Sequence, residues 1–252
     1  MTAYAEIAPP AATRRASLWR LATVELRKMA DTRAGFWLLV VCGLIAVGIV
    51  GIVVGFGNEE DKALNSMLEG TLGTTSVLLP IVGILLVTSE WSQRTALATF
   101  TLVPERERVV AAKFIAGIVF AIVATGVCLL VAVVGTAIAG GEWTLPAAAV
   151  ANGLLYQVLG MVMGMALGLA LMSSPLTIVL YFVLPTVIAI VFQSINALNS
   201  AGEWIDTSST FQPLVENEMS GGDWSRLAVS AGIWLLVPLV IGLVRLRRSE
   251  LK

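Results

Sequence analysis

The side chains best suited to specific chemistry lie in one short segment, residues 90–113, between two long apolar stretches. Glu90 and Arg94 are four residues apart, so they share one face if the segment is helical. A carboxylate and a guanidinium placed in this way form charge-assisted hydrogen bonds, with each other or with a partner. Arg106, Arg108 and Lys113 follow. The segment could therefore bind another protein, or its cations could anchor the flanking helices to an anionic leaflet.

Residues that several other chemistries require are missing from the sequence. The 252 residues include no histidine, which excludes histidine acid–base catalysis and histidine metal sites. None of the four lysines lies in a Gly-x-x-x-x-Gly-Lys-Ser/Thr motif, so the sequence has no P-loop. The predicted spans have no ionisable residue near their centres, where ion-driven transporters usually place one. We expect no catalytic residue, bound cofactor or metal in this chain, and no enzymatic activity of its own.

The composition predicts an all-α integral membrane protein. Apolar residues make up 57% of the chain and charged residues only 13%, about half the charge of a soluble domain. A run of ~20 apolar residues is long enough to cross the hydrocarbon core of a bilayer as a helix. Six such runs are predicted, at 35–56, 71–88, 114–139, 147–172, 176–195 and 227–244.

Two segments precede the predicted spans. Residues 1–16 include two prolines and two arginines but no apolar core, so we expect a disordered cytoplasmic terminus without a signal peptide. Residues 17–34 place Trp19 and Leu26 on one helical face and charged residues, including Glu25, on the other. This pattern predicts an amphipathic helix that lies in the membrane interface. A solvated helix packed on a partner is the alternative.

The distribution of basic residues predicts the orientation. If both termini are cytoplasmic, fourteen cations fall on cytoplasmic segments, including the loop 90–113 and a basic tail at 245–252. Only Lys62 and Arg226 then fall outside, as expected from the excess of Lys and Arg in cytoplasmic loops. Arginine outnumbers lysine twelve to four, which favours a bacterial source and hence the bacterial cytoplasmic membrane. The outer segment 196–226 mixes aromatic and polar residues, which predicts short helices at the outer leaflet.

Glycines at spacings of four predict close helix contacts. Gly51 and Gly55 form one pair in the first span, and Gly160, Gly164 and Gly168 form a row in the fourth. Small residues at this spacing allow two helix backbones to approach closely in a membrane. The contact could lie within one chain or between two chains.

Three features together resemble a known family. They are the six spans, an amphipathic helix ending in Val24-Glu25-Leu26-Arg27-Lys28, and the loop Glu90-Trp91-Ser92-Gln93-Arg94-Thr95 with Pro104-x-Arg106-x-Arg108 and Lys113. In these features the chain resembles the ABC-2 permeases, the membrane subunits of ATP-binding-cassette exporters. The resemblance implies an ABC-2 exporter architecture in which a second permease chain, identical or different, completes a dimer. Two separate P-loop ATPase subunits would then hold the ATP and Mg²⁺.

The resemblance also implies roles for particular residues. Glu90, Trp91, Arg94 and Thr95 would belong to a coupling helix that contacts the ATPase, and Glu25 would lie beside it in a connecting helix. In the family, spans two and five line the central cavity, and here each has a proline near its centre that frees a backbone carbonyl. Polar residues of these spans become pathway candidates, or else hydroxyls bonded to their own helix. The candidates are Thr74, Thr75, Ser76, Pro80, Thr177, Tyr181, Pro185, Thr186 and Gln193.

The function implied is that of a permease subunit in an ABC export system. Its cargo would be hydrophobic or amphiphilic, such as a drug or antibiotic, because the candidate pathway has no charged residue. A lipid or a lipophilic peptide is the alternative cargo within this class. A membrane channel or scaffold without an ATPase is the alternative from another class. The lipid bilayer is an expected partner, and nucleic acid is not.

Overall fold

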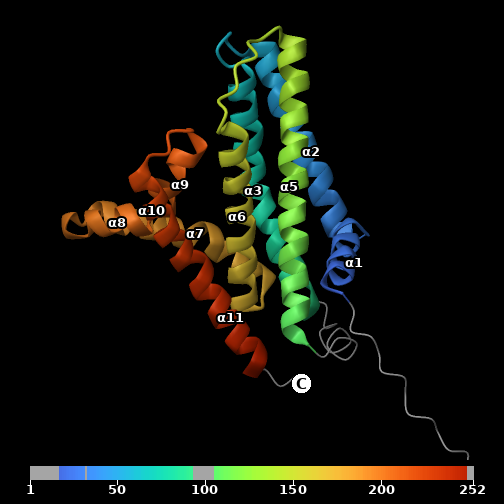
Figure 1. Cartoon of the computed structure of the whole chain (residues 1–252), viewed down its shortest axis with the longest axis vertical. Helices are drawn as coiled ribbons and strands as arrows, with labels where there is room; N and C mark the ends of the chain where they lie inside the picture. Colours follow the sequence, from blue (N-terminus) through green and yellow to red (C-terminus); the bar gives the residue numbers. More distant parts are fainter. Residues whose placement is uncertain (1–16, 32, 93–104, 249–252) are drawn as a thin grey trace, which may run out of the picture.

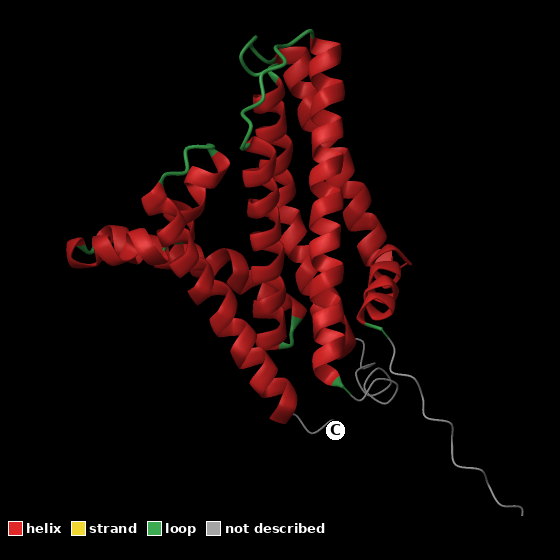
Figure 2. Cartoon of the chain, in the orientation of Figure 1, coloured by secondary structure: helices red, strands yellow, loops and turns green. Residues whose placement is uncertain are grey.

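The structure is a computed structural model that describes residues 17–31, 33–92 and 105–248. Within these ranges every regular element is a helix, and Figure 2 shows helices and connecting loops without a strand. The predicted disordered terminus 1–16 lies outside the described residues, as do Arg94 and Thr95.

Long helices and several short ones follow one another along the chain (Figure 1). The first six are α1 (Leu18–Asp31), α2 (Arg33–Phe56), α3 (Leu64–Ser92), α5 (Arg106–Ala139), α6 (Ala149–Leu171) and α7 (Ser174–Ser194). Short helices then connect α7 to the last long helix. They are η1 (Asn196–Leu198), α8 (Asn199–Ile205) and α9 (Thr207–Val215). The last helix consists of α10 (Gly221–Ala231), the π-helical turn η2 (Gly232–Leu236) and α11 (Val237–Arg248).

Five helices in the described ranges are long and apolar enough to cross a membrane, which indicates a membrane-embedded protein. They are Leu64–Trp91, Arg106–Ala139, Ala149–Leu171, Ser174–Ser194 and Gly221–Arg248. Within α2, the apolar helical stretch Val40–Phe56 is shorter than these five. The all-helical membrane class is confirmed, whereas the count of six spans stays a prediction.

Two helices, α3 and α5, extend well beyond the predicted spans. The predicted span 71–88 lies inside α3, and the predicted span 114–139 lies inside α5, which begins at Arg106. An apolar run marks only the part of a helix that matches hydrocarbon, whereas the backbone hydrogen bonds continue into more polar sequence. Glu90 and Lys113, placed by the sequence in a loop, are therefore residues of α3 and α5.

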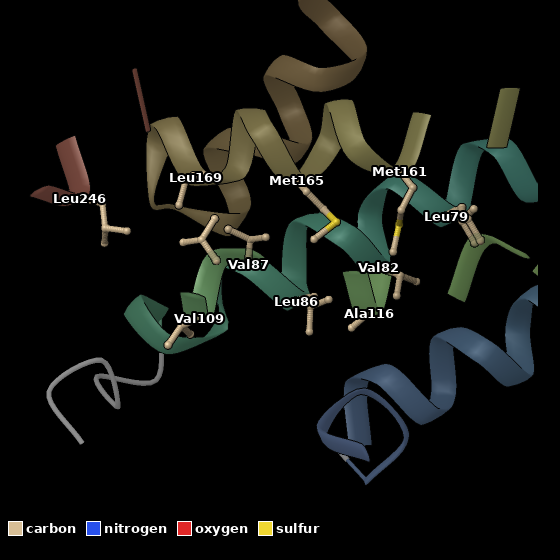
Figure 3. Close-up of a cluster of buried hydrophobic side chains, with 12 residues drawn as sticks. Leu79, Val82, Leu86, Val87, Val109, Ala116, Met161, Met165, Leu169 and Leu246 are labelled. Atoms are coloured by element: carbon tan, nitrogen blue, oxygen red, sulfur yellow. The ribbon is translucent and has the colours of Figure 1, made fainter. Parts of the chain in front are cut away.

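The main core lies where α3, α5 and α6 pack together. Met161 and Met165 project from α6 toward α3, and Leu169 lies one turn further along the same face (Figure 3). Space for the two methionines exists because facing positions are glycine. A Cβ at Gly83 would lie 2.8 Å from the sulfur of Met161, and one at Gly117 would lie 2.5 Å from the sulfur of Met165. The two glycines thus give the flexible methionine side chains room to fill the interface.

The glycine row of α6 faces α3 of the same chain. A Cβ at Gly164 would lie 2.9 Å from the carbonyl oxygen of Pro80, and one at Gly168 would lie 3.3 Å from Cγ2 of Thr88. A Cβ at Gly160 would be 3.6 Å from Cγ of Pro80, so the whole row allows close approach to α3. Of the two predicted alternatives, this row makes the contact within one chain.

Gly51 and Gly55 behave differently from the row in α6. Both are exposed on α2, and a Cβ at either position would meet no atom within 4 Å in the part of the chain that the structure describes. Neither glycine therefore makes a close helix contact among the described residues, and the alternative, a contact between two chains, stays a prediction. Within the chain, α2 packs against α3 and α5 through other positions, Val50 among them.

The predicted short helices of segment 196–226 are present. Asp206 begins α9, because its Oδ1 accepts a hydrogen bond from the backbone nitrogen of Ser208 at 2.9 Å. Thr210 of α9 donates to Ser230 of α10 at 3.0 Å, which joins these two helices. Phe211, Leu214 and Leu227 pack with Met163 of α6. The short helices thereby form a unit beside α6 and α7, on one side of the long helices (Figure 1).

Candidate functional site

Four ionisable side chains meet where α1 packs against the end of α3 and the start of α5. Lys113 donates from Nζ to Oε2 of Glu25 at 2.6 Å, and the same nitrogen lies 3.3 Å from Oε1 of Glu90. Nζ of Lys28 lies 2.7 Å from Oε1 of Glu25 and 3.7 Å from Oε1 of Glu90. We call Glu25, Lys28, Glu90 and Lys113 the basal cluster. Its two carboxylates and two ammonium groups balance in charge.

Three of the four members are buried. Glu25 and Glu90 are each 4% exposed and Lys113 is 2% exposed, whereas the side chain of Lys28 is 47% exposed. Removing a charge from water costs several kcal/mol, so buried ions persist only when they are paired and hydrogen-bonded. Lys113 meets this condition well, because it also donates to the carbonyl oxygen of Leu86 at 3.1 Å.

Glu90 is the least satisfied member of the basal cluster. Both of its carboxylate oxygens are buried, and neither has a hydrogen-bond partner among the described residues. Among the described residues, its negative charge is balanced by the ammonium groups of Lys113 and Lys28, at 3.3 and 3.7 Å. The interactions of Glu90 within the cluster therefore depend on both lysines remaining close.

The electrostatics of α1 favour the ionised state of its two cluster residues. Burial by itself raises the pKa of the Glu25 carboxyl, but the charge of Lys113 and the hydrogen bonds from Lys113 and Lys28 outweigh this and hold the pKa below its usual value. Burial lowers the pKa of Lys28, and its contacts with Glu25 and Glu90 reverse that effect and raise the pKa. Glu25 and Lys28 are consequently both charged at neutral pH.

These positions correct two sequence-based expectations. Glu25, expected on the polar face of the first helix, lies on its buried face together with Ala22, because Lys113 is there to pair with it. Glu90, expected in a loop between two spans, lies inside α3, where the neighbouring Ser89 donates its hydroxyl to the carbonyl of Leu86 at 3.2 Å. Neither carboxylate is on a surface that an ATPase could contact directly. Trp91 is partly buried and packs against the main core.

A cavity of about 460 Å³ lies in a different part of the chain, between α3, α6, α7, α9 and η2. We call it the lateral cavity. Its lining includes an aromatic group formed by Tyr156, Tyr181, Phe182, Phe211 and Trp234. Its polar lining residues are Ser76, Thr207, Ser208, Gln212 and Glu216.

The aromatic rings of the lateral cavity are held in place by specific contacts. The hydroxyl of Tyr181 donates to the carbonyl of Gly160 at 3.3 Å, and Nε1 of Trp234 donates to the carbonyl of Ile205 at 2.8 Å. Tyr156 and Phe211 form an edge-to-face pair with ring centroids 6.1 Å apart. These contacts join α7 and α9 to α6, and η2 to α8, so the fold holds the rings around the cavity.

The structure places the pathway candidates in different environments. Ser76, Tyr181 and Pro185 line the lateral cavity, whereas Pro80 packs against Gly164 of α6. The remaining four hydroxyls bond to the carbonyl one turn earlier in their own helix. Thr74 donates to Gly70 at 3.0 Å, Thr75 to Thr71 at 2.8 Å, Thr177 to Ser173 at 2.6 Å and Thr186 to Phe182 at 2.9 Å.

The contacts of those four threonines match the alternative stated from the sequence, in which the hydroxyl bonds to the backbone of its own helix. Thr75 and Thr177 are also buried, with Thr75 beside the sulfur of Cys128 at 3.2 Å. Gln193 is exposed near the end of α7 and does not line the cavity. The physical reason is that a hydroxyl in an apolar helix satisfies itself most directly on its own backbone, so residue type alone does not locate a pathway.

Several lining residues were not predicted from the sequence. Tyr156 belongs to a span without a mid-span proline, and Phe211 and Glu216 belong to the outer segment. The mixture of aromatic and polar residues in that segment was the available signal, and it predicted helices at the leaflet. It did not predict that α9 would fold back against α6 and complete a cavity wall.

Comparisons with known proteins add no assignment to this geometry. No protein-family model matches the chain, and no curated protein matches it. The function is therefore inferred from the residues and their arrangement.

Proposed function

We propose that this chain is the permease subunit of an ABC export system, powered by separate P-loop ATPase subunits. The observation that supports this best is the basal cluster. It joins α1 to the two helices that flank the segment 93–104, through Glu90 on one side and Lys113 on the other. A partner that displaced this segment would act on α3 and α5 at their ends, and the ion pairs would couple α1 to the same movement.

The arrangement of charge supports a cytoplasmic position for the basal cluster. Cations of α1, of the start of α5 and of the end of α11 lie at the same end of the helices, which is the lower end in Figure 1. The α2–α3 connection, at the other end, contains Glu59, Glu60 and Asp61. Cytoplasmic ends of membrane helices are enriched in Lys and Arg. Both termini would therefore lie in the cytoplasm of a bacterial cell.

In this assembly the buried residues of the basal cluster and the segment 93–104 have different roles. Glu25 and Glu90 are positioning residues inside the permease, because their carboxylates contact lysines of the same chain. Arg94 and Thr95 remain the proposed contacts with the ATPase, and the ATPase pair binds ATP and Mg²⁺. A second permease chain completes the exporter, whose cargo is a hydrophobic or amphiphilic molecule such as a drug or antibiotic.

Co-purification from the native host tests the proposal. The tagged full-length chain is expected to bring down a P-loop ATPase, and Arg94→Glu is expected to reduce its yield at least tenfold because an attraction becomes a repulsion. Arg248→Glu is the matched control, since this exposed cation ends α11, at the same end of the helices as the end of α3 and the start of α5, but lies outside the segment 93–104. ATP-dependent export of the cargo should fall in parallel with ATPase yield.

Two results would contradict the assignment. Absence of any P-loop ATPase from the wild-type preparation, under conditions that keep the membrane complex intact, would contradict the ABC export function. Equal ATPase yields for Arg94→Glu and Arg248→Glu would contradict the role of Arg94 while leaving the export function in place.

Cysteine labelling tests the proposed orientation independently. In a chain without Cys42 and Cys128, single cysteines at the exposed positions Asn58 and Glu218 are expected to react with a membrane-impermeant maleimide in intact cells. A cysteine at Glu107, which is also exposed, is expected to react only after the cells are opened. Labelling of position 107 in intact cells would reverse the topology.

A further inference from the structure

The lateral cavity is built by one chain alone. Its lining residues come from α3, α6, α7, α9 and η2, and at about 460 Å³ its volume is in the range of sites that bind drug-sized molecules. Its apolar wall includes Met163 and Leu167 of α6 together with Phe182 of α7. Such a wall would hold the apolar body of a ligand without help from a second permease.

The charge on the described lining of the cavity is negative. Glu216 is the one ionisable residue other than tyrosine among the described lining residues. Its carboxylate accepts a hydrogen bond from Nε2 of Gln212 at 2.6 Å, and no ion pair among the described residues involves it. Within the described part of the chain no cation neutralises the negative charge at this side of the cavity, and it would attract a positive charge on a ligand.

The aromatic lining favours the same sign of charge. Two of the three tyrosines of the sequence, Tyr156 and Tyr181, line the cavity together with Phe182, Phe211 and Trp234. The face of an aromatic ring attracts cations electrostatically, and most strongly where water is excluded. Phenyl and indole rings also contact an apolar ligand over a large area. Aromatic rings beside one unpaired carboxylate match a molecule that is both apolar and positively charged.

We propose that the lateral cavity is a binding site, within one chain, for a lipophilic organic cation whose charge lies near Glu216. This inference rests on the proposed function, since it names the chemical class of the cargo. It differs from the sequence-based expectation of an uncharged pathway, because Glu216, directly after α9, lines the cavity wall. An anion of the same shape would be repelled by Glu216, and a small hydrophilic cation would leave the apolar wall unfilled.

Tetraphenylphosphonium and tetraphenylborate form a suitable pair of probes, because they have nearly the same shape and opposite charge. Binding to the purified full-length chain in an uncharged maltoside detergent is measured by equilibrium dialysis against protein-free detergent. We expect saturable binding of the cation, at least tenfold tighter than that of the anion. Glu216→Gln should weaken cation binding about tenfold and leave anion binding unchanged or stronger.

Two further variants separate a site from general surface attraction. Glu218→Gln removes the same charge from a neighbouring residue that is exposed, as Glu216 is, but does not line the cavity, and it should leave cation binding unchanged. Leu167→Trp adds volume to the cavity wall and should reduce cation binding at least tenfold. Gel filtration and circular dichroism confirm that each variant is folded. Competition by phosphatidylcholine, but not by phosphatidylglycerol, would identify a lipid headgroup as the natural cation, and its absence would identify a free molecule.

The proposal is overturned if the two probes bind equally, if the Glu216 and Glu218 variants have the same effect, or if Leu167→Trp leaves binding intact. These measurements need no ATPase. A chain that binds the cation but brings down no ATPase would refute the export system and not the site. A chain that brings down an ATPase but binds neither probe would refute the site and not the export system.

Discussion

Lys113→Met is expected to destabilise the protein by about 3–5 kcal/mol, the range for removing one partner of a buried ion pair. Lys113 is 2% exposed and contacts both Glu25 and Glu90. Its loss would leave the buried carboxylate of Glu90 with Lys28 alone, at 3.7 Å. Neither oxygen of Glu90 has a hydrogen bond from another described residue to compensate. Thermal unfolding of the purified chain in detergent measures the effect.

A matched lysine in the same cluster is the control. Lys28 is 47% exposed, so Lys28→Met should cost only about 1 kcal/mol or less. The triple variant Glu25→Gln, Glu90→Gln and Lys113→Met removes the unpaired charges as well, and it should recover much of the stability lost in Lys113→Met. Equal destabilisation by Lys113→Met and Lys28→Met would show that the burial of a lysine in the basal cluster does not determine how much stability its removal costs.

The same contacts change the expected behaviour of Glu90→Lys. If Glu90 were a surface contact of the coupling helix, this variant would fold normally and fail only in ATPase binding. In the structure a lysine at this position would bring a third ammonium group beside Lys113 and Lys28. Repulsion among buried like charges should impair folding itself, so the variant cannot report on ATPase binding alone.

Gly164→Leu is expected to destabilise the protein by about 1–3 kcal/mol or more, because an extra side chain must enter a packed interface. A Cβ at this position would lie 2.9 Å from the carbonyl oxygen and 3.2 Å from Cβ of Pro80. Both atoms belong to the proline of α3, which cannot rotate away, so α3 and α6 would have to separate. Loss of thermal stability and of monodisperse protein in gel filtration measures the effect.

Gly126→Leu is the matched control for this substitution. Gly126 lies within α5, is exposed, and a Cβ there would meet no atom within 4 Å among the described residues. The same change of residue should therefore leave thermal stability nearly unaffected. Equal stability of the Gly164 and Gly126 variants would refute the close contact between α3 and α6.

The sequence was sufficient for features that depend on local composition. Apolar runs identify the spanning helices, because a helix in lipid must satisfy its backbone internally and present apolar side chains. The mixed segment 196–226 was correctly predicted to form short helices, since capping residues such as Asp206 act on the next residues in the chain. The glycine row of α6 was also visible, although its partner helix was not.

Tertiary structure decided which residues meet, because those contacts join distant parts of the chain. Glu25 and Lys113 are 88 residues apart, so nothing in the local pattern of α1 could place that carboxylate on the buried face. The same holds for the lateral cavity, where α9 returns to α6 and brings Glu216 into the wall. Hydropathy locates helices because their side chains match the lipid or water around them. The pairing of buried charges depends on the distances between helices, and these are set by the three-dimensional packing alone.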